Sequence, residues 1–497
     1  MSVGVANVRR VIERWSRDQV LSLAPDASSR KAAQGVAAPG RWPVRGLTGE
    51  VLFGECEGSG ATPYQACVDL GEPAYRCSCP SRKFPCKHAL GLLLLWSSDG
   101  VPHADGLPAW AGEWLAQREA RAARSAARLE AAPSPPPRNG ESLRHGRVAA
   151  GLAELERWLA DQIRQGLATA APHDWEGLAK RLIDAQAPGA AGMVTRLARV
   201  RDEDEWPGRL LEEHALLHLL AVAYRRRAEL PPELAETVLM RVGFPVTREE
   251  VLARPVVRDR WDVLGRRDEE QDRLTARRVW LRGRSTGRAA LILSFAPSGQ
   301  PLDASLVTGT AIDADLAFYP GAAPLRALVA HRHPPALREA VAEHAPQPSA
   351  PSGTLAGHAS PSLSGAGSPR TGVRADSPEA PLMGGSGAET GSSAGDARGA
   401  SSEAGGVVPG MSADDAMGEV AAALAADPWT ESWPLVLTGV VPGEATLAGF
   451  PLLASWRGVW RLLAVSGGRP VTVAAEWTPR GLRPLTTWDE DGTVVIL

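Results

Sequence analysis

Three cysteines and one histidine occur within twelve consecutive residues, where the chain reads C-S-C-P-S-R-K-F-P-C-K-H. The four candidate ligands are Cys77, Cys79, Cys86 and His88. Three thiolates and one imidazole make up the full donor set of a closed tetrahedral zinc site. A catalytic zinc keeps one position open for water, and here the protein fills all four. The segment therefore predicts one structural Zn²⁺, and with it a small module that depends on metal for its stability.

The spacing of each ligand pair restricts the local backbone. The first two cysteines lie two residues apart, and on a strand over 74–79 such side chains point to the same face. Cys86 and His88 are also two apart, but in a helix that spacing puts them on nearly opposite sides. We therefore expect Cys86 in a turn and His88 in the first turn of a buried, apolar helix over 88–96.

The C-x-C, short gap, C-x-H spacing resembles the signature of the SWIM zinc-finger family. The resemblance covers about residues 1–105, and the family's four ligand positions fall on the three cysteines and the histidine named above. It implies binding to nucleic acid or to protein, not a reaction. Some bacterial members look to be encoded beside AAA-type ATPases, which implies an ATPase-centred assembly as partner.

Length and charge limit the alternatives. A chain of 497 residues predicts two to four domains. The net charge of −3 means that any affinity for nucleic acid must come from a local basic patch. Arg82, Lys83 and Lys87 form one such patch and would also offset the negative charge of a zinc bound by three thiolates.

The state of the cysteines and the length of the apolar segments predict the cellular compartment of the protein. The first ten residues lack the apolar region of a signal peptide, and the longest apolar run, near 90–96, is too short to span a bilayer. Cys56 and Cys67 are expected to be reduced core thiols beside a site that needs reducing conditions. We therefore expect a cytoplasmic protein that does not contact a membrane.

The expected fold class is α+β and multidomain: a small zinc-stapled ββα-like module, an all-helical middle region and a β-rich C-terminal part. The predicted divisions are a SWIM-type module at 1–105, an arginine-rich helix and linker at 106–140, a helical domain at 141–265, an α/β region at 266–345 that can continue after a tether, a disordered Gly/Ser/Pro-rich tether at 346–412, and a β-rich domain at 413–497.

Capping residues and apolar periodicity predict the individual elements. Asp26 is expected to cap a helix that follows a break at Pro25. The predicted strands are 42–53, 64–70, 279–295, 306–316, 435–437, 459–465, 471–477 and 494–497, and the predicted helices include 324–333, 335–345 and 413–426. The helical region fits either a bundle or a repeat array, and most C-terminal tryptophans are expected in a core.

Two further patterns are candidate sites. A helix over 108–131 carries Arg118, Arg121, Arg124 and Arg128 along one stripe, which fits a phosphate-binding face but more often a solvated one. His214 and His218 share a helical spacing that can hold a metal. They lack the glutamate of the metalloprotease motif, so an ordinary amphipathic face is expected.

No phosphate loop, nucleophile elbow, kinase set or HExxH motif occurs, so there is no candidate catalytic residue and no small-molecule substrate to infer. The favoured interpretation is a non-enzymatic zinc-binding adaptor for protein partners. The first alternative is DNA or RNA binding by the zinc module, with Arg82, Lys83, Lys87 and the arginine helix. The second is an unrecognised enzyme.

Overall fold

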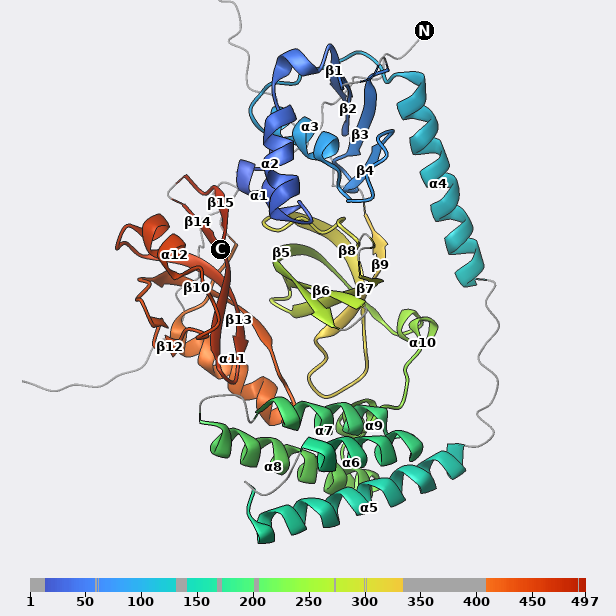
Figure 1. The fold of residues 1–497 in the computed structure, drawn as a ribbon, viewed down its shortest axis with the longest axis vertical. Coiled ribbons are helices and arrows are strands. Elements are labelled where there is room, and N and C mark those ends of the chain that lie inside the picture. The colour runs from blue at the N-terminus through green and yellow to red at the C-terminus, as the bar shows by residue number, and fades with distance from the viewer. Residues whose placement is uncertain are drawn as a thin grey trace, which may run out of the picture. The chain divides into compact units, whose positions relative to one another are not determined.

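The computed structural model describes residues 14–58, 60, 62–130, 141–167, 172–200, 205–271, 274–298, 300, 302–333, 408–489 and 491–497 (Figure 1). The linker expected at 133–137, the helix expected at 335–345 and the tether up to residue 407 lie outside these ranges. The fold class is the predicted one: a sheet with a Cys/His cluster, a helical middle region and β-rich structure beyond it. No helix of the described ranges is both long enough and apolar enough to cross a membrane.

The N-terminal module is an antiparallel sheet of order β1-β2-β3-β4 with helices against it. Its elements are α1 (Arg17–Ser22), α2 (Ala27–Val36), β1 (Val44–Thr48), β2 (Val51–Cys56), β3 (Tyr64–Asp69), β4 (Ala74–Cys77) and α3 (Lys87–Ser97). Asp26 caps α2 as predicted, because its carboxylate accepts the amide of Ser29 at 2.7 Å. The region expected as one strand over 42–53 is a hairpin, with Gly49 at φ +58° in its turn.

Helix α3 is the centre of this module's core. Every residue from His88 to Trp96 is buried, because apolar side chains cover the whole circumference of the helix. One side packs on β2 and β3, and another packs on α2. The approach to α2 is close at Gly91, where an added Cβ would lie 2.6 Å from Cγ2 of Val36.

Helix α4 (Ala109–Glu130) covers the opposite face of the same sheet at its first turns. Ala111 and Trp114 pack with Phe53 and Cys67 in a small second core. Farther along, Arg118 forms ion pairs with carboxylates of the β3–β4 hairpin. The arginine-rich helix is therefore attached to the N-terminal module along part of its length, and its arginine side chains are not all free in solvent.

The middle region is a helical bundle, which decides against a repeat array. Its helices are α5 (Glu141–Gln165), α6 (Pro172–Asp184), α7 (Pro188–Val200), α8 (Trp206–Arg225) and α9 (Pro232–Val242). They bury one continuous apolar core in which leucines at helical spacing, such as Leu152, Leu155 and Leu159 of α5, face inward. Trp429 from the C-terminal part also joins this core, where its indole donates to the carbonyl of Leu216 at 2.9 Å.

A closed barrel of order β5-β6-β7-β9-β8 follows the bundle and a short helix, α10 (Arg248–Leu252). Its strands are β5 (Val256–Gln271), β6 (Leu274–Gly283), β7 (Ala289–Pro297), β8 (Ala311–Phe318) and β9 (Arg326–Arg332). Two predictions are wrong here. Residues 256–265, expected within the helical region, begin β5, and 324–333, expected as a helix, contains β9. Both segments are strands because distant segments pair with them, which local sequence does not reveal.

The C-terminal part combines a sheet of order β10-β13-β14-β15 with helix α11 (Ala413–Ala426), whose bounds match the prediction. The remaining elements are β10 (Trp433–Val440), β11 (Thr446–Leu447), β12 (Phe450–Pro451), α12 (Val459–Ser466), β13 (Val471–Thr478), β14 (Gly481–Trp488) and β15 (Val494–Ile496). The strand expected at 459–465 is wrong. It is helix α12, which buries Leu462 and Ser466 four residues apart and ends at Gly467 with φ +55°.

The tryptophans of this part mostly lie in cores, as expected. Trp429 and Trp488 are buried, while Trp460 on α12 is 68% exposed. The β stretches before and after the tether form a barrel and a separate sheet. The two still contact each other, and Leu264 and Trp280 of the barrel share a core with Val436 of β10.

The barrel also contacts the N-terminal module. Ala304 and Val307, from the segment between β7 and β8, belong to the same buried core as helix α3. Gln19 of α1 donates its side-chain amide to the carbonyl of Thr308 at 2.9 Å. The module that carries the Cys/His cluster is thus packed on the barrel through a continuous apolar contact.

Candidate metal centre

The four predicted ligands converge on one point. The Sγ atoms of Cys77, Cys79 and Cys86 and one ring nitrogen of His88 all lie within 4.8 Å of one another. The Cys77 Sγ to His88 Nδ1 distance is 3.7 Å. Donors placed about 2.0–2.3 Å from a tetrahedral ion stand about 3.5–3.8 Å apart. The donor set and its spacing therefore fit Zn²⁺, with every ligand supplied by the protein.

Each half of the site is built by a different element. Cys77 is the last residue of β4, and Cys79 follows in a bend, so the strand is shorter than the predicted 74–79. Cys86 is the N-cap of α3 and His88 is the helix's second residue, which confirms the expected turn-then-helix placement. The departure of the backbone from regular structure after Cys77 lets both sulfurs of the first pair turn toward the helix.

Neighbouring groups fix the orientation of the ligands. The ring of Tyr64 stacks on His88 with centroids 4.6 Å apart and planes at 24°. Between the first two cysteines, Ser78 donates its amide to the carbonyl of Gln65 at 3.0 Å, and its hydroxyl oxygen accepts the amide of Gln65 at 2.9 Å. These contacts orient the histidine ring and the C-x-C segment.

Charge is distributed unevenly over the thiols. A hydrogen bond with Cys77 lowers the pKa of Cys86 to about 4, while the same bond raises the pKa of Cys77. Burial raises the pKa of Cys79. A metal ion binds cysteine as the thiolate, so the thiol protons of the cluster leave when a metal binds.

The basic residues around the site differ in their availability. Arg82, Lys83 and Lys87 are all exposed. Lys83 is already paired, since its ammonium lies 2.7 Å from a carboxylate oxygen of Asp26 and 2.9 Å from the hydroxyl of Ser28. The patch therefore presents fewer unpaired cations than the sequence suggested.

The other sequence candidates do not gather into sites. His214 is buried and bonds to the carbonyl of Leu210 through Nδ1 at 2.7 Å, whereas His218 is exposed. Cys56 and Cys67 are free and fully buried, as expected. Across the described part of the chain, no other group of three or more Cys, His, Asp or Glu side chains meets the same distance limit.

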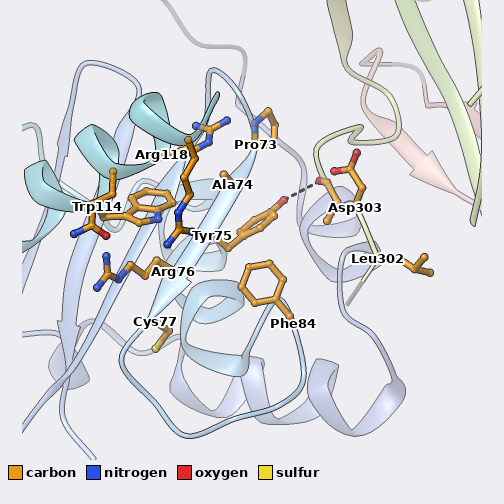
Figure 2. A pocket seen from close by; sticks show the side chains of 13 residues that line it. Pro73, Ala74, Tyr75, Arg76, Cys77, Phe84, Trp114, Arg118, Leu302 and Asp303 are labelled. Carbon is orange, nitrogen blue, oxygen red and sulfur yellow. Dashed lines mark hydrogen bonds between the residues drawn. The ribbon is translucent and has the colours of Figure 1, made fainter. Parts of the chain in front are cut away.

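A pocket beside the metal centre was not anticipated from the sequence. It has a volume of about 650 Å³ and lies along β4, between helix α4 and the segment 302–304 (Figure 2). Its lining includes Tyr75, Arg76 and Cys77 from β4, and Trp114 and Arg121 from α4. We call it the β4 pocket. Sequence analysis missed it because its walls come from segments about 200 residues apart, and only the arginine stripe of α4 gave a signal.

Comparison with known families agrees with this architecture. A family model described as the SWIM zinc finger matches residues 67–96, and one described as the SWIM-associated four-helix bundle domain matches residues 143–242. No curated protein and no solved structure matches the chain. The first match contains all four clustered ligands, and the second covers helices α5 to α9. With a SWIM zinc finger followed by a SWIM-associated bundle, this chain is a SWIM domain-containing protein.

Proposed function

We propose that this chain is a non-enzymatic adaptor in which a single structural Zn²⁺, held by Cys77, Cys79, Cys86 and His88, shapes a surface that docks a partner protein. The observation that carries the proposal is the closed donor set: four protein ligands converge within 4.8 Å and leave no coordination position for a substrate. A metal used in this way stabilises a recognition surface and takes no part in a reaction.

The surroundings of the site support a docking role. The N-terminal module packs on the barrel through α1 and β4, so its zinc loop belongs to a module that is supported by a second domain. Arg82 and Phe84 of that loop are exposed, Phe84 by 39%. Exposed aromatic and arginine side chains are enriched in protein-binding surfaces. An ATPase-centred assembly is the partner class that we propose.

Nucleic-acid binding is the second candidate, and the exposed Arg82 and Lys87 favour it. Against it, Lys83 is paired with Asp26, and Arg118 is paired with Asp69 and Glu72. Two of the cations that would contact phosphate are thereby already neutralised. Because affinity for a nucleic acid scales with the phosphates neutralised, we rank this candidate below the adaptor.

The chemistry of the cysteines supports a reducing compartment. A site built on thiolates, with Cys56 and Cys67 free in the same module, needs conditions that keep thiols reduced. We therefore propose that the protein works in the cytoplasm.

Photo-crosslinking separates the two candidates in one experiment. Arg82 is replaced by p-benzoylphenylalanine in the full chain within its own cells, and a matched control carries the same group at Arg248, an exposed residue of α10. The adaptor proposal expects adducts at position 82 that protease removes and nuclease does not. Nuclease-sensitive adducts would favour nucleic acid instead. Equal labelling at both positions, or none at position 82, would overturn the proposal.

A further inference from the structure

Strand β4, which ends at the first ligand Cys77, lies at the edge of its sheet. The strand order is β1-β2-β3-β4, and in the described part of the chain no other strand pairs with the outer side of β4. Five consecutive residues, Pro73 to Cys77, line the β4 pocket. The pocket therefore runs along a strand edge, which is the place where a sheet can accept another strand.

The register shows which main-chain groups face that edge. Ser78 bonds to Gln65 of β3, and bonding alternates along an antiparallel pair, so Arg76 and Ala74 also face β3. Tyr75 and Cys77 then point their amides and carbonyls outward. The described residues provide no hydrogen-bond partner for the amide of either one. The outward-facing amides and carbonyls of Tyr75 and Cys77 can therefore form main-chain hydrogen bonds with a strand added at this edge.

The walls of the pocket suit an extended chain. On one side stand Trp114 and Arg118 of α4, and on the other the segment 302–304 (Figure 2). The hydroxyl of Tyr75 donates to the carbonyl of Ala304 in that segment at 3.4 Å. Arg277 of β6 also donates to the carbonyl of Asp303 at 2.6 Å. The wall formed by residues 302–304 is therefore held in place, and the pocket volume lies in the range of about 300–1,000 Å³ found for ligand sites.

The charges of the lining select the occupant. Three arginines line the pocket, Arg76, Arg118 and Arg121, against one carboxylate, that of Asp303. Arg118 is neutralised by the hairpin carboxylates, but Arg76 and Arg121 form no ion pair with any residue that the structure describes. A bound chain with acidic side chains at alternate positions would neutralise both.

We propose that the β4 pocket binds an extended acidic segment of a partner protein, which adds to β4 as a fifth strand of the sheet. This inference rests on the proposed adaptor function and names the docking site. Main-chain bonds to Tyr75 and Cys77 supply affinity, and Arg76 and Arg121 supply selectivity for acidic side chains. Single-stranded nucleic acid is the less favoured occupant, because it cannot pair with the alternating amides and carbonyls of a strand edge as a peptide backbone does.

The test uses the full, zinc-loaded chain and fluorescein-labelled peptides of the repeat Glu-Val, followed by anisotropy. Two control peptides are the Lys-Val repeat, which reverses the charge, and a Glu-Val repeat with every amide N-methylated, which cannot donate main-chain hydrogen bonds. An oligothymidylate serves as the nucleic-acid probe. We expect binding of the Glu-Val repeat alone, with slower amide exchange at Tyr75 and Cys77.

Charge-reversal variants locate the site. Arg76→Glu and Arg121→Glu should each weaken binding of the Glu-Val repeat about tenfold. Arg124→Glu is the matched control, because Arg124 lies on the same helix, is exposed and does not line the pocket. It should change the affinity by less than about twofold, the effect of screened long-range charge.

Several results would overturn the inference. These are no anisotropy change with the Glu-Val repeat up to about 1 mM, equal binding of the N-methylated peptide, equal weakening by Arg124→Glu, or preferential binding of the oligothymidylate. If the peptides fail while position 82 still crosslinks to protein, the adaptor function stands and only its placement at β4 is wrong. If both fail, the adaptor function itself is wrong.

Discussion

Tyr75 and Ala304 are joined by a hydrogen bond of 3.4 Å between the tyrosine hydroxyl and the alanine carbonyl, across 229 residues of sequence. Tyr75 is two residues before the first predicted ligand, Cys77. Ala304 lies in the segment between barrel strands β7 and β8, and it is also part of the core around α3. The metal centre and the barrel are therefore mechanically linked. On the proposed structural role of zinc, an ion that ordered the N-terminal module would also support one wall of the β4 pocket.

Loss of one zinc ligand should loosen the finger and the adjoining barrel segment together. In Cys79→Ser, bound zinc should fall well below one per chain, because structural sites of this kind are worth about 10–16 kcal/mol in isolated finger peptides. Hydrogen exchange should speed up over residues 40–100 and 302–310, while residues 143–242 stay protected. The control Cys67→Ala should keep its zinc, since Cys67 is a core thiol outside the cluster. Unchanged exchange in Cys79→Ser would contradict a structural role for the metal.

Removing the Tyr75 hydroxyl should destabilise the contact between finger and barrel modestly. Tyr75→Phe deletes one hydrogen bond to a main-chain carbonyl, a loss of about 0.5–1.5 kcal/mol, and keeps the buried ring. Chemical denaturation of the finger measures the change. Tyr64→Phe is the matched control, because the Tyr64 ring stacks on His88 and the described residues provide no partner for its hydroxyl. An equal or larger effect in Tyr64→Phe would show that the loss of a tyrosine hydroxyl in general, and not of the bond to Ala304, causes the change.

Gly91→Ala should destabilise the protein although alanine is the better helix former. The added methyl group would lie 2.6 Å from Cγ2 of Val36 and 3.3 Å from the carbonyl oxygen of Ala33, so α2 and α3 would have to separate. Overpacking of this kind costs about 1–3 kcal/mol, more than the roughly 1 kcal/mol of helix propensity gained. In α4, Gly112 has nothing within 4 Å of the added position, and Gly112→Ala should be neutral or stabilising. The midpoint of thermal unfolding should therefore fall in Gly91→Ala and stay the same or rise in Gly112→Ala.

The barrel contains an ion pair whose contribution should vanish in acid. Burial works to raise the pKa of Asp268, but hydrogen bonds from Arg277, both at 2.7 Å, outweigh it and the pKa is lowered. A lowered pKa means that this stabilisation is complete above the unfolded value of 3.8 and is lost as the pH falls through the folded value. Asp268→Asn should cost about 1–2 kcal/mol at pH 7, at the low end for such pairs because Asp268 is 39% exposed.

The measurement is urea denaturation of wild type and Asp268→Asn at pH 7 and near pH 3. The difference between them should shrink on acidification. A difference that stays constant, or grows, would show that Asp268 does not stabilise the barrel through its charge. Arg277 also holds the carbonyl of Asp303, so the variant should loosen that wall of the β4 pocket as well.

Local sequence was sufficient wherever short-range chemistry decides the structure. The spacing of Cys77, Cys79, Cys86 and His88 predicted the cluster. Each pair of ligands is only two residues apart in sequence, so the four metal-binding side chains can reach a single ion. The Asp26 cap and the bounds of α11 followed from the same local rules of capping and periodicity. The assignment of these four residues as zinc ligands remains a prediction until metal is measured, although their convergence now supports it.

Tertiary structure decided the rest. Residues 326–332 form a strand and 459–466 form a helix, against expectation, because a short apolar segment takes the conformation that its distant partners can pair with or bury. The same reason hid the β4 pocket: Arg76, Trp114 and Asp303 meet only after the barrel has packed on the finger. The sequence by itself determined that the chain carries a compact metal-ligand set. Only the packing of remote segments decided that this set stands next to a strand edge, and beside two arginines, that have no partner among the residues the structure describes.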